Sequence, residues 1–193
     1  MRQTTQSRTT KETTITVGLN LDGTGVSTID TPIPFFNHML RALAFYAKFD
    51  LNVTASGDTD VDDHHLVEDI GIVLGQALNR CLQDKTGITR FASALTPMDE
   101  ALSCVVLDIS NRPVLVFEAD FKREQIGGLS LENVREFFYA LAMESRVTLH
   151  LSVLYGSNDH HKVESLFKGV GRTLRTAVVV EGTEVPSTKG VLE

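Results

Sequence analysis

Apolar residues recur along this chain with two different periods, which predict strands and helices. Between Ile15 and Leu21 every second residue is apolar, the period of a half-buried strand. Over about 63–82 apolar residues recur every three or four positions, the period of a helix with one buried face. For the first half, the pattern as a whole predicts strands over 15–21 and 26–29, a helix over 36–47, a strand over 49–55 and a helix over 63–82.

The second half repeats this order. The pattern predicts strands over 101–109 and 114–119, a helix from an N-cap at Ser130 through 145, a strand over 147–153 and a helix over 159–178. No linker rich in Pro, Gly or Ser separates the halves. We therefore predict a single α/β (α+β) domain over 1–193, in which a β-β-α-β-α unit occurs twice, at about 10–95 and 96–193, around one core.

One motif occurs in both halves, at the start of the last predicted helix of each. It reads His-His-x-x-Glu, and its two copies begin 96 residues apart, at His64 and His160. On a helix the Glu shares a face with both histidines, while the adjacent histidines diverge by about 100°. Adjacent rings are therefore poorly placed to bind one ion. The motif predicts ligands for two metals: His64, His65, Glu68, His160, His161 and Glu164.

Imidazole and carboxylate at this spacing are transition-metal ligands, and open mixed sites favour six-coordinate Mn or Fe over structural Zn. One helix cannot complete a site, so either the halves meet or another subunit contributes ligands. His38 and Glu136, 98 residues apart, lie near the start of the first helix of each half and are candidate further ligands. His150, in an alternating strand, is expected to be structural. Nearby acidic side chains either orient the histidine rings or form a solvated cluster: Asp60, Asp62, Asp63 and Asp69.

Charge and composition narrow the possible partners and the compartment. The net charge of −7 argues against nucleic acid as a partner. Cys81 and Cys104 are too few for a disulfide framework, which favours a reducing cytoplasm. No apolar run approaches the roughly 20 residues that span a bilayer, and the polar N-terminus lacks an apolar signal core. We expect a cytoplasmic protein with no membrane partner.

The last residues have the chemistry of an anion site. Ser187, Lys189 and the backbone beside Gly190 can surround a phosphate. Such a site in an acidic protein would need further cations to converge on it. The candidates are Arg90, Arg112, Lys168, Arg172 and Arg175.

Seven segments in collinear order strongly resemble imidazoleglycerol-phosphate dehydratase. They are RTTKET (8–13), FFNHML (35–40), DDHHLVEDIG (62–71), PMDEAL (97–102), LDISNRP (107–113), NDHHKVESLFK (158–168) and PSTKG (186–190). The resemblance implies a duplicated fold related to the second domain of ribosomal protein S5. It also implies 24-subunit shells built from trimers, with two Mn²⁺ per active site at subunit interfaces. Fe²⁺ or another divalent metal is an alternative.

The reaction implied by the resemblance removes water from D-erythro-1-(imidazol-4-yl)glycerol 3-phosphate in histidine biosynthesis. The proton to be lost sits on an unactivated carbon. Metal bound to the ring nitrogens favours the imidazolate, which expels hydroxide through a diazafulvene-like intermediate. The matching motifs imply that Glu12 is the acid/base carboxylate, that Asp99 is a second active-site acid and that phosphate is bound by Arg90, Arg112, Lys168, Ser187 and Lys189.

The chain departs from the family's usual residues at a few positions. Arg41-Ala42 stands where Asp-Gln is common, Tyr46 and Glu136 stand where many members have His, and Asn37 replaces an Asp. Two other functions are weighed against the dehydratase: a catalytically weak shell protein assembled by metal, and a dinuclear metallohydrolase. Glu12, Asp99 and the expected phosphate-binding residues favour the dehydratase over the shell protein. The order of residues in the motif and the PSTKG tail favour it over the metallohydrolase.

Overall fold

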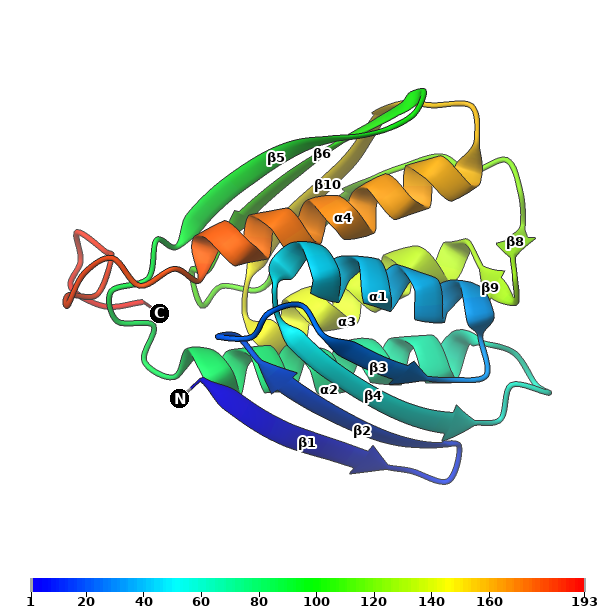
Figure 1. The fold of residues 1–193 in the computed structure, drawn as a ribbon, viewed down its shortest axis with the longest axis horizontal. Coiled ribbons are helices and arrows are strands. Elements are labelled where there is room, and N and C mark those ends of the chain that lie inside the picture. Colours follow the sequence, from blue (N-terminus) through cyan, green and yellow to red (C-terminus); the bar gives the residue numbers. More distant parts are fainter. Residues whose placement is uncertain (1, 193) are drawn as a thin grey trace.

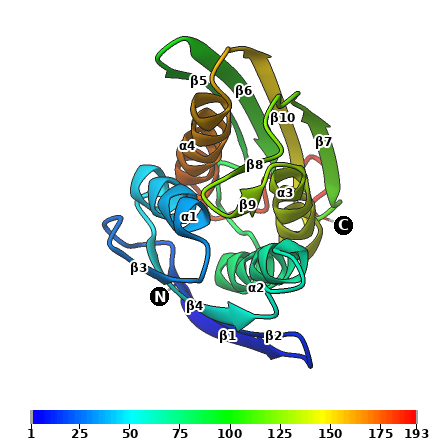
Figure 2. The same cartoon turned by 90° about the vertical axis from the view of Figure 1, so that its right-hand side faces the viewer.

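The computed structural model describes residues 2–192, in which four helices lie between two four-stranded sheets (Figures 1 and 2). The helices are α1 (Pro34–Ala47), α2 (His64–Leu82), α3 (Glu132–Ser145) and α4 (Asp159–Ala177). The strands are β1 (Gln3–Thr9), β2 (Thr13–Asn20), β3 (Ser27–Asp30), β4 (Asp50–Gly57), β5 (Phe91–Met98), β6 (Ala101–Asp108), β7 (Val114–Glu118), β8 (Gln125–Ile126), β9 (Leu129–Ser130) and β10 (Thr148–Tyr155). Within residues 2–192 no helix is long and apolar enough to cross a membrane.

The two large sheets have the same construction. The strand order is β1-β2-β4-β3 in one and β5-β6-β10-β7 in the other. In each sheet the first three strands pair antiparallel, and the last pairs parallel with its neighbour. Parallel neighbours need a crossover connection, which α1 provides between β3 and β4, and α3 between β7 and β10. Strands β8 and β9 form a separate small hairpin before α3.

All four helices begin at the same end of the molecule, the end that faces the viewer in Figure 2. The long helices α2 and α4 both carry the His-His-x-x-Glu motif in their first turns. The fold therefore brings both motifs to one end, although they are 96 residues apart in the sequence.

A cluster of phenylalanine rings joins the two halves at the centre of the core. Phe36 of α1, Phe137 and Phe138 of α3 and Phe167 of α4 are all fully buried. The rings of Phe137 and Phe167 stack with their centroids 5.3 Å apart, and Phe36 meets Phe137 edge-on at 5.2 Å. Aromatic pairs in these geometries add about 0.5–1.5 kcal/mol beyond their buried area. The buried residues of both halves belong to one continuous hydrophobic cluster.

Helices α1 and α3 end in the same way, at residues that correspond in the two halves. Lys48 and Arg146, 98 positions apart, both adopt the left-handed conformation, with φ of 60° and 59°. The backbone N–H of each donates to carbonyl oxygens of the last helical turn, which satisfies groups that a helix end leaves unpaired.

The predicted mixed α/β class and the ten predicted elements are confirmed, with two corrections. Each half begins with a strand that the pattern did not reveal, β1 or β5, so the order in the first half is β-β-β-α-β-α. The second half has the same order with the small β8–β9 hairpin, also not predicted, inserted before α3. Ser130 is not the N-cap of α3; the cap position is Leu131, and Ser130 lies in β9 with its side chain bound to Asp63. The Ser130 hydroxyl donates to the carboxylate of Asp63, the residue just before α2, and does not cap α3.

Gly71 tests the contact between α2 and α3. A Cβ there would lie 2.7 Å from the Phe137 carbonyl oxygen and 3.0 Å from Ala140 Cβ, so Gly71→Ala forces the helices apart. Overpacking costs about 1–3 kcal/mol, against roughly 1 kcal/mol that Ala gains over Gly in a helix. We expect a net loss in the free energy of unfolding, measured by urea titration at fixed protein concentration. Gly18→Ala is the control, because its nearest atom lies at 3.6 Å; equal stability of both variants would contradict the expectation.

Candidate metal centre and active site

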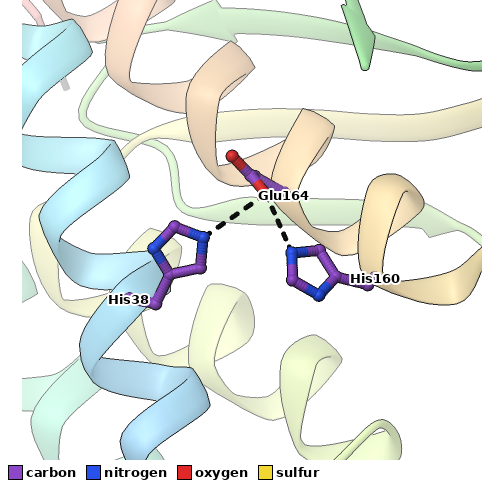
Figure 3. Close-up of side chains that lie close together, drawn as sticks. All are labelled: His38, His160 and Glu164. Carbon is purple, nitrogen blue, oxygen red and sulfur yellow. Dashed lines mark hydrogen bonds and ion pairs between the residues drawn. The ribbon is translucent and has the colours of Figure 1, made fainter. Parts of the chain in front are cut away.

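One group of possible metal ligands lies between α1 and α4 (Figure 3). His38 projects from α1, and His160 and Glu164 from the first turns of α4. Both rings aim Nε2 at the same oxygen, Glu164 Oε2, at 3.4 Å from His38 and 3.0 Å from His160. The three ligand atoms lie within 4.8 Å of one another, so a single cation can contact all of them.

The carboxylate of this group is buried and ionised. The side chain of Glu164 is 8% exposed. Burial alone would raise its pKa, but the Lys168 ammonium, 2.7 Å from Oε1, and the His160 and His38 rings hold the pKa below its usual range. Lys168 therefore fixes one oxygen of Glu164, and the other stays directed at the two histidines.

A second group surrounds His65 at the start of α2. Its Nδ1 lies 3.1 Å from Asp58 Oδ2 and 3.9 Å from Glu12 Oε2. The hydrogen bond to Asp58 and the charge of Glu12 raise the pKa of His65. Glu12 stands just before β2, in the turn that follows β1, and Asp58 just after β4, so neighbouring strands deliver both carboxylates to the helix.

The second half has a matching arrangement around His161. Asp99 and Glu100 form the turn between β5 and β6, and Glu100 Oε2 lies 2.6 Å from His161 Nδ1. The other oxygen of Glu100 accepts the backbone N–H groups of Ser157 and Asn158, at 2.9 and 2.7 Å. These three hydrogen bonds lower the pKa of Glu100 far below its usual range. Asp99 Oδ2 lies 3.6 Å from the Nε2 of His161.

The five histidines gathered at this end of the molecule share one orientation. His65 and His161 direct Nδ1 at carboxylates, and His64 directs Nδ1 at Asn133 Oδ1, 3.0 Å away. A ring that donates from Nδ1 keeps the Nε2 lone pair for another partner. His38 and His160 present Nε2 to Glu164 directly. All five rings thus offer the same nitrogen, which fits a set of metal ligands.

The remaining candidate ligands are less closely grouped. Glu68 Oε2 lies 3.8 Å from His64 Nε2. Glu136 pairs with Arg135 at 2.8 Å, and in residues 2–192 it joins no group of ligand atoms. The ring centroids within the two His pairs lie 6.1 and 6.0 Å apart, and the ring planes meet at 84° and 80°, so the rings of a pair face different directions. His150 is exposed on β10 and belongs to no such group in the described chain.

The phosphate-type residues line a cavity of about 760 Å³ beside the C-terminal tail. Arg90 is held there by two hydrogen bonds to Asp108 and one, of 2.7 Å, to the Pro186 carbonyl oxygen. The wall includes Arg90, Arg112, Ser187, Thr188 and Lys189. Lys168 is not part of this wall, because its ammonium is paired with Glu164. Arg90 adopts a positive φ of 73°, a costly conformation that often accompanies a functional site.

This cavity and the histidine groups lie at opposite ends of the folded molecule. Arg90 immediately precedes β5, whereas Asp99, which contacts His161, immediately follows it. Eight strand residues separate them, or roughly 27 Å. Figure 1 shows the tail at the left-hand end and the starts of all four helices at the right.

Four acidic residues near the motifs were candidates for orienting the histidine rings: Asp60, Asp62, Asp63 and Asp69. Within residues 2–192, none of them forms a hydrogen bond to a histidine ring. Asp62 accepts the backbone N–H of His64, Asp63 binds Ser130, and Asp69 binds Arg8 and Thr13. The residues that do orient the rings, Asp58, Glu100 and Asn133, were missed by sequence reasoning. For Glu100 a signal existed, since it corresponds to Glu12: each immediately precedes the second strand of its half.

Fold and site together define an α/β protein with histidine–carboxylate groups at one end and an anion cavity at the other. The family model for imidazoleglycerol-phosphate dehydratase matches residues 31–174. Proteins of that name from Exiguobacterium sp. and Clostridioides difficile are 53% and 54% identical over 100% and 96% of both chains. The chain belongs to the imidazoleglycerol-phosphate dehydratase family and is accordingly a carbon–oxygen lyase.

Solved structures agree with this assignment. The crystal structure of imidazoleglycerol-phosphate dehydratase from Staphylococcus aureus is 39% identical, with a TM-score of 0.83, and covers 91% of this chain and 98% of its own. A Pyrococcus furiosus structure of the family is 42% identical at the same TM-score, with 97% and 100% covered. The resemblance seen in the motifs is thus confirmed for the whole chain.

The pair formed by Glu100 and His161 predicts a pH effect. Because Glu100 raises the pKa of His161, Glu100→Gln should lower that pKa toward about 6.5, followed by NMR titration of the ring in metal-free protein. The ion pair stabilises the fold above the unfolded Glu pKa of about 4.3 and loses its effect as pH rises through the raised pKa of His161. The stability difference between wild type and variant should therefore be larger near about pH 5.5 than about pH 9.

His65 is an internal reference for this titration, since its partner Asp58 lies in the other half. Its pKa should stay unchanged in the Glu100→Gln variant. An unchanged pKa for His161 would mean that Glu100 does not hold the ring.

Proposed function

We propose that this chain converts D-erythro-1-(imidazol-4-yl)glycerol 3-phosphate into 3-(imidazol-4-yl)-2-oxopropyl phosphate and water, a step of histidine biosynthesis. The observation that carries the proposal is the gathering of five histidines at one end, all offering Nε2, together with carboxylates. The relatives from Exiguobacterium sp. and Clostridioides difficile bear the name of this activity, and the family membership of the chain supports the same reaction.

The donor set fits a transition metal. Imidazole nitrogen with one or two carboxylates suits Mn²⁺ or Fe²⁺. The buried, ionised Glu164 pairs one oxygen with Lys168 and directs the other at His38 and His160, where a cation can bind. We propose two Mn²⁺ per active site, with another divalent metal as the alternative. When bound, such ions would act as Lewis acids on the imidazole ring of the substrate. The proposed ligands are His38, His64, His65, Glu68, Glu136, His160, His161 and Glu164.

The chain's own residues supply the proton transfer. A carbon proton must be removed, and the departing hydroxide must leave as water. Glu12 is half-exposed, with its side chain 56% accessible, and lies beside His65, so it can reach a ligand bound at that ring. Asp99 lies beside His161, 3.6 Å from its Nε2. We assign Glu12 as the acid/base and Asp99 as a second acid that orients the substrate.

The cavity beside the tail suits the phosphate. Guanidinium groups of Arg90 and Arg112, the Lys189 ammonium and the Ser187 hydroxyl can neutralise and hydrogen-bond a phosphate dianion. Lys168 is proposed to join them from another subunit, because in its own chain it lies beside Glu164 rather than at the cavity wall.

The separation of the two residue sets supports assembly. An imidazole ring joined to a glycerol phosphate cannot span the length of β5, about 27 Å. The site must therefore combine the histidine end of one chain with the phosphate end of another. We propose a homo-oligomer, a 24-mer built from trimers. Each chain is one domain of two pseudo-repeats, predicted at about 10–95 and 96–193; in the structure the halves begin with β1 and β5.

A defined-metal assay is the direct test. Mn²⁺-loaded protein should form 3-(imidazol-4-yl)-2-oxopropyl phosphate. Glu12→Gln should abolish turnover while particle size by light scattering stays unchanged, because the Glu12 side chain is 56% exposed and is not among the proposed metal ligands. Wild-type protein that assembles with Mn²⁺ yet forms no product would instead support a metal-assembled shell protein. Normal turnover by the variant would remove Glu12 from the mechanism.

Mixing two inactive variants tests the shared site. His64→Ala removes a proposed metal ligand, and Arg112→Ala combined with Lys189→Ala removes two cavity cations. Each variant alone should lose nearly all activity. Subunits mixed before assembly should regain part of it, because some sites then combine an intact histidine end with an intact phosphate end. Mixtures no more active than the parents would indicate that one chain builds the whole site.

A further inference from the structure

The connection between β7 and α3, residues 119–131, lies across the end of the molecule where the helices begin (Figure 2). It contains the β8–β9 hairpin, whose turn is Gly127-Gly128. Both glycines have positive φ, 50° and 83°. The connection is bound at three places to elements that carry the histidines, and none of these contacts takes part in the chemistry proposed above.

The first attachment joins β9 to the start of α2. Asp63 precedes His64 and is only 8% exposed, yet its carboxylate caps no helix. Its two oxygens accept the Ser130 backbone N–H at 2.8 Å and the Ser130 hydroxyl at 2.7 Å. Both carboxylate oxygens of Asp63 therefore accept hydrogen bonds from the connection.

The second attachment joins the beginning of the connection to the start of α4. Asp159 precedes His160 and is 3% exposed. One of its oxygens accepts the backbone N–H groups of Lys122 and Arg123, both at 2.8 Å. The other accepts the Lys162 ammonium, which also donates to the Asp120 carbonyl oxygen, at 2.9 Å each. Asp63 and Asp159 are 96 residues apart, so they hold the same place in the two motifs.

The third attachment reaches a histidine ring through Phe35 of α1. The backbone N–H of Phe35 donates to the Gly127 carbonyl oxygen at 3.4 Å. A Cβ on Gly127 would lie 2.9 Å from Phe35 Cβ, so the hairpin presses directly on this residue. The Phe35 ring in turn meets His160 edge-on, with centroids 4.9 Å apart, and lies 6.4 Å from the His38 ring.

We propose that the connection over 119–131 is a positioning element that fixes both His-His pairs relative to each other. Asp63 and Asp159, which directly precede the two His-His pairs, both bind the connection. The hairpin packs against Phe35, whose ring contacts His160. Ring orientation controls metal affinity, and outer groups that hold ligand rings typically contribute about 10–100-fold. The connection thus acts on the ligands of both halves without touching the metal or the substrate.

Gly127 and Gly128 provide a matched pair of variants. Both have positive φ, so an Ala at either position meets the same kind of backbone strain. Only at Gly127 would the new Cβ push on Phe35; at Gly128 its nearest neighbour is Ile33 Cγ2 at 3.8 Å. Gly127→Ala should therefore bind Mn²⁺ about ten-fold more weakly than Gly128→Ala, with similar unfolding temperatures for the two metal-free proteins. Free Mn²⁺ is measured by its EPR signal during titration of the metal-free, full-length protein.

Ser130 provides an independent pair and serves if Gly127→Ala fails to fold. Ser130→Ala deletes the hydroxyl that binds Asp63, and Ser152→Ala deletes an exposed strand hydroxyl that binds Glu118 at 3.3 Å. Only Ser130→Ala should weaken Mn²⁺ binding, again by about ten-fold.

This inference rests on the proposed metal centre, and the titration separates the two. Wild-type protein that binds no Mn²⁺ would overturn the metal centre and this inference together. Wild-type protein that binds Mn²⁺, with Gly127→Ala equal to Gly128→Ala and Ser130→Ala equal to Ser152→Ala, would leave the metal centre intact and overturn the positioning role alone.

Discussion

The common direction of the four helices is the constraint on which the other features of this molecule depend. The helices lie between two sheets of identical strand order and start at one end, so each first turn offers its side chains to the same region. The stacked Phe137 and Phe167 rings hold helices of the second half together, and Phe36 adds a helix of the first. The histidine groups are exposed by comparison, yet their places are fixed by this buried contact between halves.

Carboxylates at strand ends then complete what the helices begin. His65 and His161 each bond an acidic residue through Nδ1, and those residues come from turns that adjoin the central strands of the two sheets. A helix alone cannot choose which ring nitrogen its histidine presents, because the ring rotates about a broad torsion. The sheets make that choice, and for this reason neither layer of the fold would form the site without the other.

Sequence periodicity foresaw the ten elements with a clear apolar face and missed those without one. Strand β1 reads Gln-Thr-Thr-Gln-Ser-Arg-Thr and contains no apolar residue, so only its backbone pairing with β2 makes it a strand. Strand β5 has the large apolar residues Phe91 and Leu95 on its exposed side, so its sequence does not show which face is buried. The ligand motifs were visible because helical spacing is local. Glu100 and Asn133 were not, because they reach their histidines across 61 and 69 residues, and Lys168 was assigned to phosphate although its nearest partner is Glu164.

The distance between the histidine end and the phosphate end has a consequence for how the activity would be controlled in a cell. Under the proposed sharing of the site between subunits, a solitary chain would have no complete site at all. Catalytic output would then rise more steeply than in proportion to the amount of chain synthesised, because neighbours must meet before either end is useful. At concentrations too low for subunits to associate, the protein would be folded but inactive. The concentration of the chain would therefore determine whether it is active.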